Sequence, residues 1–227
     1  MLKHIASLIV FICFSMGFAF ADEVDPSRFN DDIAKVEKRI ARGDSKPGEV
    51  LFVGSSSIRL WDLKKSFPEQ SYNNHGFGGS HISDVIHFFD RVVTPVKPSV
   101  IVFYAGDNDL AAKKTPETVV ADYKRFMKLV DEKCPDCHAV VYIPVKPSIK
   151  RWEQRDVQMA TNAAIAGLSV SNSKLHTVDI VTPMLGPDGT PRKELFAEDG
   201  LHLSRAGYEI WTRIVRDKLN ALGRQPK

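Results

Sequence analysis

Cysteine is scarce in this chain of 227 residues, with three copies, and acidic and basic residues nearly balance. Because a chain of this length buries a substantial core unaided, it does not depend on a disulfide framework. A net charge of +3 gives no reason to expect nucleic acid or a strongly acidic membrane surface as a partner. The sequence also has no internal repeat, low-complexity tract or long flexible linker. These absences favour a single domain whose partner is a small molecule.

One long hydrophobic run is present, and it lies at the N-terminus. Basic residues precede an apolar stretch over residues 5–20, and Ala19 and Ala21 supply the small residues that a signal peptidase requires. The stretch is short for a membrane span and no second one follows, which favours a signal peptide over an uncleaved anchor. We therefore predict a signal peptide at residues 1–21 and one domain at residues 22–227. The mature protein is expected to be periplasmic or secreted, without stable membrane insertion.

Apolar segments of strand length alternate with segments of helical periodicity along the rest of the chain. Strands are expected at residues 49–53, 72–75, 99–104, 139–143 and 175–180, the second being the weakest. Helices are expected at residues 26–42, 82–92, 116–133, 157–169 and 205–222. The strands are apolar without a clean two-residue alternation, which is typical of a parallel sheet covered on both faces. In such α/β folds, functional groups gather at the carboxyl ends of the strands.

A serine, a histidine and an aspartate stand where a catalytic triad can form. The serine-rich residues 54–57 directly follow an apolar strand, which leaves a serine exposed at the strand's carboxyl end. Asp199 stands three residues before His202, a spacing that lets a carboxylate orient an imidazole ring for proton transfer. Their order along the chain differs from that of the serine proteases, but triads are recognised by geometry.

Two further segments at strand ends carry groups that can hold negative charge. The glycine-rich residues 76–79 leave backbone N–H groups unobstructed, and Asn108 adds a neutral amide donor. Such donors are what an oxyanion hole requires, so the combination predicts acyl transfer. Taken singly, each segment is also an ordinary turn composition, and the serines can equally cap a turn.

Four blocks, spread over nearly all of the mature chain, resemble those of the SGNH hydrolases, the GDSL-type esterases and acylhydrolases. The blocks lie at residues 53–56, 74–79, 106–109 and 199–202. The resemblance implies Ser56 as the nucleophile, His202 as the base and Asp199 as the acid that orients it. It also implies an oxyanion hole formed by the backbone N–H groups of Ser56 and Gly79 and the amide of Asn108.

The same resemblance implies a three-layer α/β/α sandwich with a mostly parallel five-stranded sheet. It implies hydrolysis of acyl esters through an acyl-serine, without a metal or an organic cofactor. The chain departs from the family at Ser55, where an aspartate usually precedes the nucleophile. The absence of a long apolar lid favours a small acyl group on a soluble or cell-envelope carrier. The alternative is a non-catalytic carbohydrate- or envelope-binding domain that keeps the fold.

Arg151 and Trp152 stand in a loop after the fourth expected strand. The guanidinium of an arginine and the aromatic face of a tryptophan at that place can hold a sugar or a polar head group, which makes both residues candidates for substrate binding. They can equally stabilise the loop itself.

Cys134, Cys137 and His138 form the Cys-x-x-Cys-His pattern at which c-type haem is attached. His138 falls at the start of an expected strand, where the sheet would occupy it rather than leave it free as an axial ligand. A structural zinc would need two further ligands, which the neighbouring sequence does not offer. For an exported protein we predict a local disulfide between Cys134 and Cys137, with free thiols as the alternative.

Overall fold

The computed structural model describes residues 25–223, so the signal peptide predicted at residues 1–21 lies outside the described part of the chain. Within it, one sheet has the strand order β2-β1-β3-β4-β5, and every pairing is parallel. The strands are β1 (Leu51–Gly54), β2 (Asn73–Asn74), β3 (Val100–Tyr104), β4 (Ala139–Tyr142) and β5 (Leu175–Thr177). The predicted α/β fold with a five-stranded parallel sheet is confirmed.

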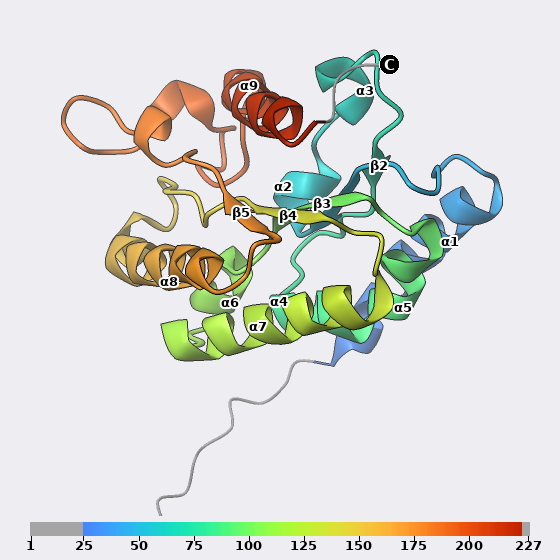
Figure 1. The fold of residues 1–227 in the computed structure, drawn as a ribbon. Helices are drawn as coiled ribbons and strands as arrows, with labels where there is room; N and C mark the ends of the chain where they lie inside the picture. Colours follow the sequence, from blue (N-terminus) through green and yellow to red (C-terminus); the bar gives the residue numbers. More distant parts are fainter. Residues whose placement is uncertain (1–24, 224–227) are drawn as a thin grey trace, which may run out of the picture.

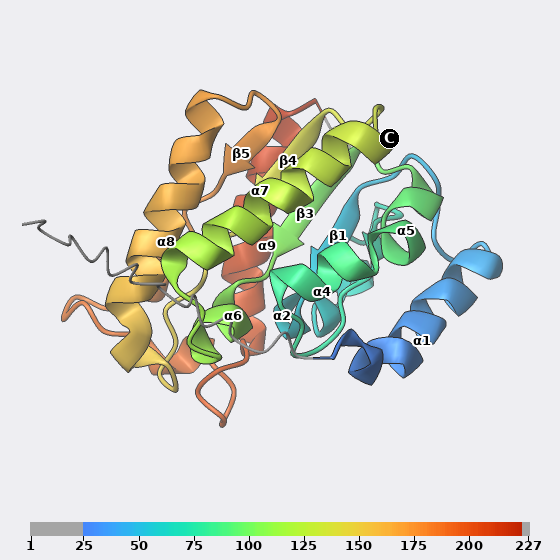
Figure 2. The ribbon, with the colours of Figure 1, turned by 90° about the horizontal axis from the view of Figure 1, so that it is seen from below.

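Helices cover both faces of this sheet and give three layers. The α-helices are α1 (Asn30–Ala41), α2 (Ser56–Arg59), α3 (Leu63–Ser66), α4 (Ile82–His87), α5 (Phe89–Val92), α6 (Asp107–Ala111), α7 (Pro116–Lys133), α8 (Arg155–Gly167) and α9 (Arg205–Ala221). Short 3₁₀ helices lie at Pro26–Phe29, Thr94–Val96, Trp152–Gln154, Leu168–Val170, Thr182–Met184 and Lys193–Leu195. Helices α3 and α9 lie on one face, and α1, α4, α5, α7 and α8 lie on the other (Figures 1 and 2).

The strand residues pack alternately into two separate apolar layers. Leu51 and Val53 of β1 belong to the layer that contains Phe126 of α7, whereas Phe52 belongs to the layer that contains Trp211 of α9. Each such buried side chain contributes roughly 1.5–3 kcal/mol relative to its exposed state. Because both faces are covered, the strand reads as an unbroken apolar run rather than an alternating one.

Some elements differ from the sequence-based expectation in their extent. The helix expected at residues 82–92 is broken at Phe88, whose backbone leaves the helical range and separates α4 from α5. Phe88 is buried and its ring packs edge-on against Phe77, with 6.1 Å between the ring centroids. Strands β2 and β5 are shorter than expected because they are edge strands, each paired on one side only.

The two cysteines of the described chain are free and buried, so the structure differs from the predicted disulfide between Cys134 and Cys137. Cys134 follows the last turn of α7, where its N–H donates to Val130 O. The Cys137 thiol donates instead to Ala139 O at 3.4 Å. Burial raises the pKa of Cys137 to about 11, which keeps its thiol protonated near neutral pH.

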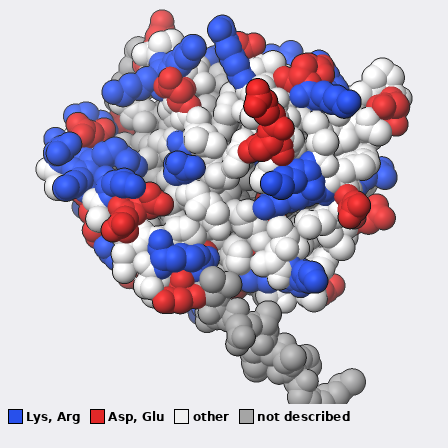
Figure 3. Space-filling view, turned by 180° about the vertical axis from the view of Figure 1, so that it is seen from behind, with Lys and Arg blue, Asp and Glu red and all other residues white. Residues whose placement is uncertain are grey.

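The described surface carries charges of both signs. Figure 3 shows lysine and arginine side chains interspersed with aspartate and glutamate on the reverse face. Between residues 25 and 223, no helix combines the length and the apolar character that a bilayer crossing requires.

His75 links three segments of the fold from a fully buried position. Its Nδ1 lies 2.6 Å from Val92 O and its Nε2 lies 2.8 Å from Ser45 Oγ. Because a carbonyl only accepts, Nδ1 carries a proton. Burial lowers the pKa of His75 and keeps the ring neutral near pH 7, so Nε2 has no proton and accepts from the serine hydroxyl.

We expect this histidine to make the fold sensitive to acid. Burial lowers the pKa of His75 from 6.5 to about 4, so the unfolded chain takes up this proton first. The contribution of His75 to the free energy of unfolding is complete above pH 6.5 and is lost as the pH falls towards 4, by at most about 1.4 kcal/mol per pH unit. Urea unfolding at pH 7 and pH 5 measures it. In His75→Gln the difference in unfolding free energy between the two pH values should shrink, and an unchanged difference would contradict the assignment.

Candidate active site

The serine-rich turn leaves β1 through an unusually close backbone approach. Gly54 has φ +135°, and a Cβ at this position would lie 1.9 Å from Tyr104 O. The next residue, Ser55, is buried and its N–H donates to the same carbonyl at 2.9 Å. Only glycine fits such a position. The turn therefore brings Ser56 to the carboxyl end of the sheet, at the first position of α2.

Ser56, His202 and Asp199 form a continuous hydrogen-bonded chain. His202 Nε2 lies 3.1 Å from Ser56 Oγ, and Nδ1 lies 2.5 Å from Asp199 Oδ2. The other oxygen of Asp199 accepts the N–H groups of Leu201 and His202, each at 2.9 Å. The hydrogen bond from the His202 ring, followed by these two backbone bonds, holds the pKa of Asp199 well below its usual range. An ionised carboxylate only accepts, so Nδ1 carries the proton and Nε2 is left to accept from Ser56.

Helix α9 fixes the segment that carries His202. Ser204 caps this helix by accepting the N–H of Gly207 at 3.3 Å. One turn later, the Tyr208 hydroxyl donates to Ser57 O at 3.0 Å. This bond joins α9 to α2, so the helices next to the histidine and the serine are held to each other.

A backbone hydrogen bond joins the glycine-rich block to the serine turn, and a side-chain bond joins the asparagine block to the residue that follows the glycine-rich block. Phe77 N–H donates to Gly54 O at 2.9 Å, and Asn108 Nδ2 donates to Ser80 O at 3.1 Å. Gly79 has φ +83°, and no other atom lies within 4 Å of where a Cβ would stand, so the space around it is open. The structure thus brings the three blocks together at one edge of the sheet.

Asp109 helps to hold the site together, a role that the sequence analysis did not predict although Asp109 ends the block at residues 106–109. It is fully buried, and its carboxylate accepts the N–H of Ile82 at 3.2 Å and the ammonium of Lys114 at 3.0 Å. These bonds tie the start of α4 to α6. The carboxylate therefore holds the glycine-rich loop against the asparagine block.

The two residues expected to contact substrate, Arg151 and Trp152, have different surroundings in the structure. Arg151 turns inward, with Nη1 2.7 Å from Asp107 Oδ1 and Nη2 3.1 Å from Asn108 Oδ1. Trp152 is half-buried, and the guanidinium of Arg155 lies over its ring at 5.4 Å. The Arg151 guanidinium is thus engaged by protein groups.

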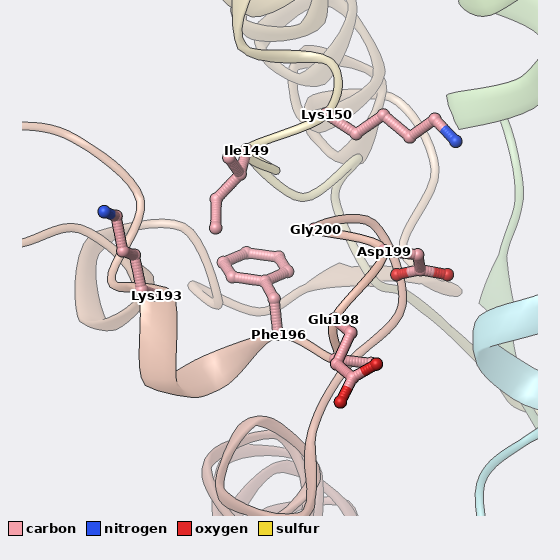
Figure 4. Close-up of a pocket in the computed structure, with 8 residues that line it drawn as sticks. Ile149, Lys150, Lys193, Phe196, Glu198, Asp199 and Gly200 are labelled. Carbon is pink, nitrogen blue, oxygen red and sulfur yellow. The ribbon is translucent and has the colours of Figure 1, made fainter.

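An open hollow of about 550 Å³ lies beside the triad (Figure 4). Ile149 and Phe196 form its apolar part, and Lys150 and Lys193 stand at its two ends. In the close-up, Asp199 lies to one side of these apolar side chains. The hollow therefore opens to solvent directly beside Asp199.

Residues 58–210 match the model of the GDSL-like lipase/acylhydrolase family. The matched segment contains Gly79, Asn108, Asp199 and His202, and it begins two residues after Ser56. Comparison with curated proteins gives no match.

Solved structures share the fold at low sequence identity. A protein from Streptococcus pneumoniae, described as a candidate platelet activating factor, has a TM-score of 0.72 at 20% identity, over 85% of this chain and 95% of that one. A GDSL-like lipase from Bacteroides thetaiotaomicron has a TM-score of 0.68 at 18% identity, over 87% and 98%. A carbohydrate esterase of family 3 from Talaromyces cellulolyticus has a TM-score of 0.62 at 17% identity, over 77% and 97%.

Proposed function

Because the chain belongs to the GDSL-like lipase/acylhydrolase family, we propose that it hydrolyses acyl esters through a covalent intermediate on Ser56. Family membership gives the enzyme class, an SGNH-type ester hydrolase. The observation that carries the proposed mechanism is the hydrogen-bonded chain from Asp199 through His202 to Ser56. It favours an active hydrolase over the alternative of a binding domain without catalysis.

In the proposed reaction, Ser56 Oγ attacks the acyl carbonyl while its proton passes to His202 Nε2. Asp199 holds the ring and stabilises the imidazolium that forms. The negative charge on the carbonyl oxygen falls on the N–H groups of Ser56 and Gly79 and on the amide of Asn108. His202 then protonates the leaving alcohol. Water then attacks the acyl-serine and gives a proton to His202. His202 passes this proton to Ser56 Oγ as the bond between Oγ and the acyl carbon breaks, which releases the acid and restores the enzyme.

For the substrate we propose an ester of a small acyl group on a soluble or cell-envelope carrier. The hollow next to Asp199 is open, and four of its lining side chains are charged, which suits a polar carrier better than a long acyl chain; they are Lys150, Lys193, Glu198 and Asp199. The likeness to a carbohydrate esterase supports acetylated sugars as the first substrates to test. Export to the periplasm or the medium is part of the proposal and rests on residues 1–21.

The direct test is hydrolysis of nitrophenyl esters of increasing acyl length, together with release of acetate from acetylated sugars. We expect kcat/KM to be highest for acetyl or similarly short esters and to fall with chain length. A preference for long chains would contradict the substrate class. Inactivity on the whole panel, together with sugar binding, would favour the alternative binding domain.

Asn108→Ala should lower kcat by about 10²-fold with a smaller change in KM, because an oxyanion donor strengthens its bond only as charge develops. Steady-state kinetics on the best ester of the panel measures both constants. Asn108→Asp is the matched variant of equal size, and it should be at least as damaging because it removes the donor. A normal kcat with a raised KM would place Asn108 in substrate binding instead.

A further inference from the structure

Arg151 contacts the side-chain oxygen of Asn108, and the Arg151 side chain is 17% exposed. Its Nη2 donates to Asn108 Oδ1 at 3.1 Å. On the other side of the same amide, Nδ2 donates to Ser80 O at 3.1 Å. The amide is therefore held by one partner at each of its two polar atoms.

These two partners permit only one orientation of the Asn108 amide. A guanidinium only donates and a backbone carbonyl only accepts, so Oδ1 must face Arg151 and Nδ2 must face Ser80. A flipped amide would set donor against donor and acceptor against acceptor. In the observed orientation Nδ2 uses one hydrogen on Ser80 and keeps its second for another acceptor.

A buried ionic cluster fixes the guanidinium in turn. Asp107 is 3% exposed, and its Oδ1 forms an ion pair with Arg151 Nη1 at 2.7 Å. Its second oxygen accepts from Lys146 at 3.0 Å, and Lys146 also donates to the Tyr104 hydroxyl at 3.1 Å. Burial by itself raises the pKa of Asp107, but the two cations outweigh it and leave the pKa lowered, so the carboxylate stays charged.

We propose that Arg151 is a positioning residue for ester hydrolysis, whose guanidinium, anchored on Asp107, turns the Asn108 amide so that Nδ2 faces the oxyanion. This role rests on the proposed function. It replaces the expectation that Arg151 contacts the substrate. The guanidinium reaches Asp107 and Asn108 with different nitrogens, which a lysine ammonium, as a single point, does not reproduce.

The test compares Arg151→Lys and Arg151→Ala with the wild type, each also in the Asn108→Ala background. Both single variants should lower kcat by about tenfold or more with KM changed less than about twofold, because misplacing a catalytic group costs rate rather than binding. In the Asn108→Ala background the same changes should cost nothing further, since the group that Arg151 positions is gone. Added guanidinium should restore part of the rate of Arg151→Ala and none of the rate of the double variant.

Arg155→Ala is the matched control, since this arginine stands in the same segment and lies over Trp152. Its kcat should equal that of the wild type. Raised KM with normal kcat in the Arg151 variants would assign substrate contact. Losses that add to that of Asn108→Ala, or a lowered melting temperature with normal kinetics, would also overturn the positioning role.

Labelling by a fluorophosphonate separates failure of this role from failure of the proposed function. Wild-type protein that is neither labelled on Ser56 nor active would overturn the proposed function, and the role of Arg151 with it. Labelled and active protein in which the Arg151 variants keep normal kcat would overturn the positioning role alone.

Discussion

Ser56→Ala is expected to lower kcat by on the order of 10³-fold or more, because binding and the oxyanion hole alone would remain. The Ser56 hydroxyl lies 3.1 Å from His202 Nε2, within reach for proton transfer. The measurement is kcat on a nitrophenyl ester of short chain, with the folded state checked by circular dichroism.

The neighbouring serines are the matched controls for this variant. Ser55 and Ser57 are both buried, at 2% and 1% exposure, whereas Ser56 is partly exposed. Ser55→Ala and Ser57→Ala should therefore give folded enzymes with substantial turnover. Peptide mapping after fluorophosphonate labelling should place the adduct on Ser56, and an adduct on either neighbour would refute the assignment.

His202→Ala should cost at least as much kcat as Asp199→Asn, with a loss on the order of 10³-fold or more for the histidine variant. The first change removes the base, whereas the second removes only its orientation and the charge beside it. The Asp199 side chain is 42% exposed, so solvent screens its charge and its removal should be the milder change. Single-turnover kinetics with a nitrophenyl ester would rank the two variants on the acylation step.

Glu198→Gln serves as the control for the aspartate, since Glu198 is an exposed carboxylate one residue earlier. It should lower kcat less than Asp199→Asn does. The reverse order would mean that Glu198, not Asp199, orients the histidine.

Local chemistry explains which elements the sequence predicted well. Helix α7 occupies the expected residues 116–133 because Thr115 caps it and Pro116 stands at its first position, two signals that act within one turn. The break at Phe88 carries no such signal, since it depends on how that ring packs in the finished core. Edge strands are hard to delimit for the same reason, because their length is set by the neighbouring strand.

Ser56 and Asn108 were identifiable because each stands in a short block at a strand end, whereas Asp199 and His202 were identifiable from their spacing of three residues ahead of a helix. Their roles stay predictions that the variants above test. The engagement of Arg151 could not be foreseen, because it depends on which way a flexible side chain turns. Its partner Asp107 lies 44 positions earlier in the chain, and no sequence pattern links the two.

The close approach of Gly54 to the carbonyl of Tyr104 attaches the serine turn to β3, the middle strand of the sheet. The serine turn is attached to two interior strands, β1 and β3. Core strands of this kind open only with global unfolding, which is why their amide hydrogens exchange most slowly. His202 lies instead on a partly exposed surface segment, which a few backbone hydrogen bonds hold in place. We therefore expect heating to displace His202 before it disturbs Ser56. If so, activity lost on brief heating should return on cooling, without unfolding of the sheet.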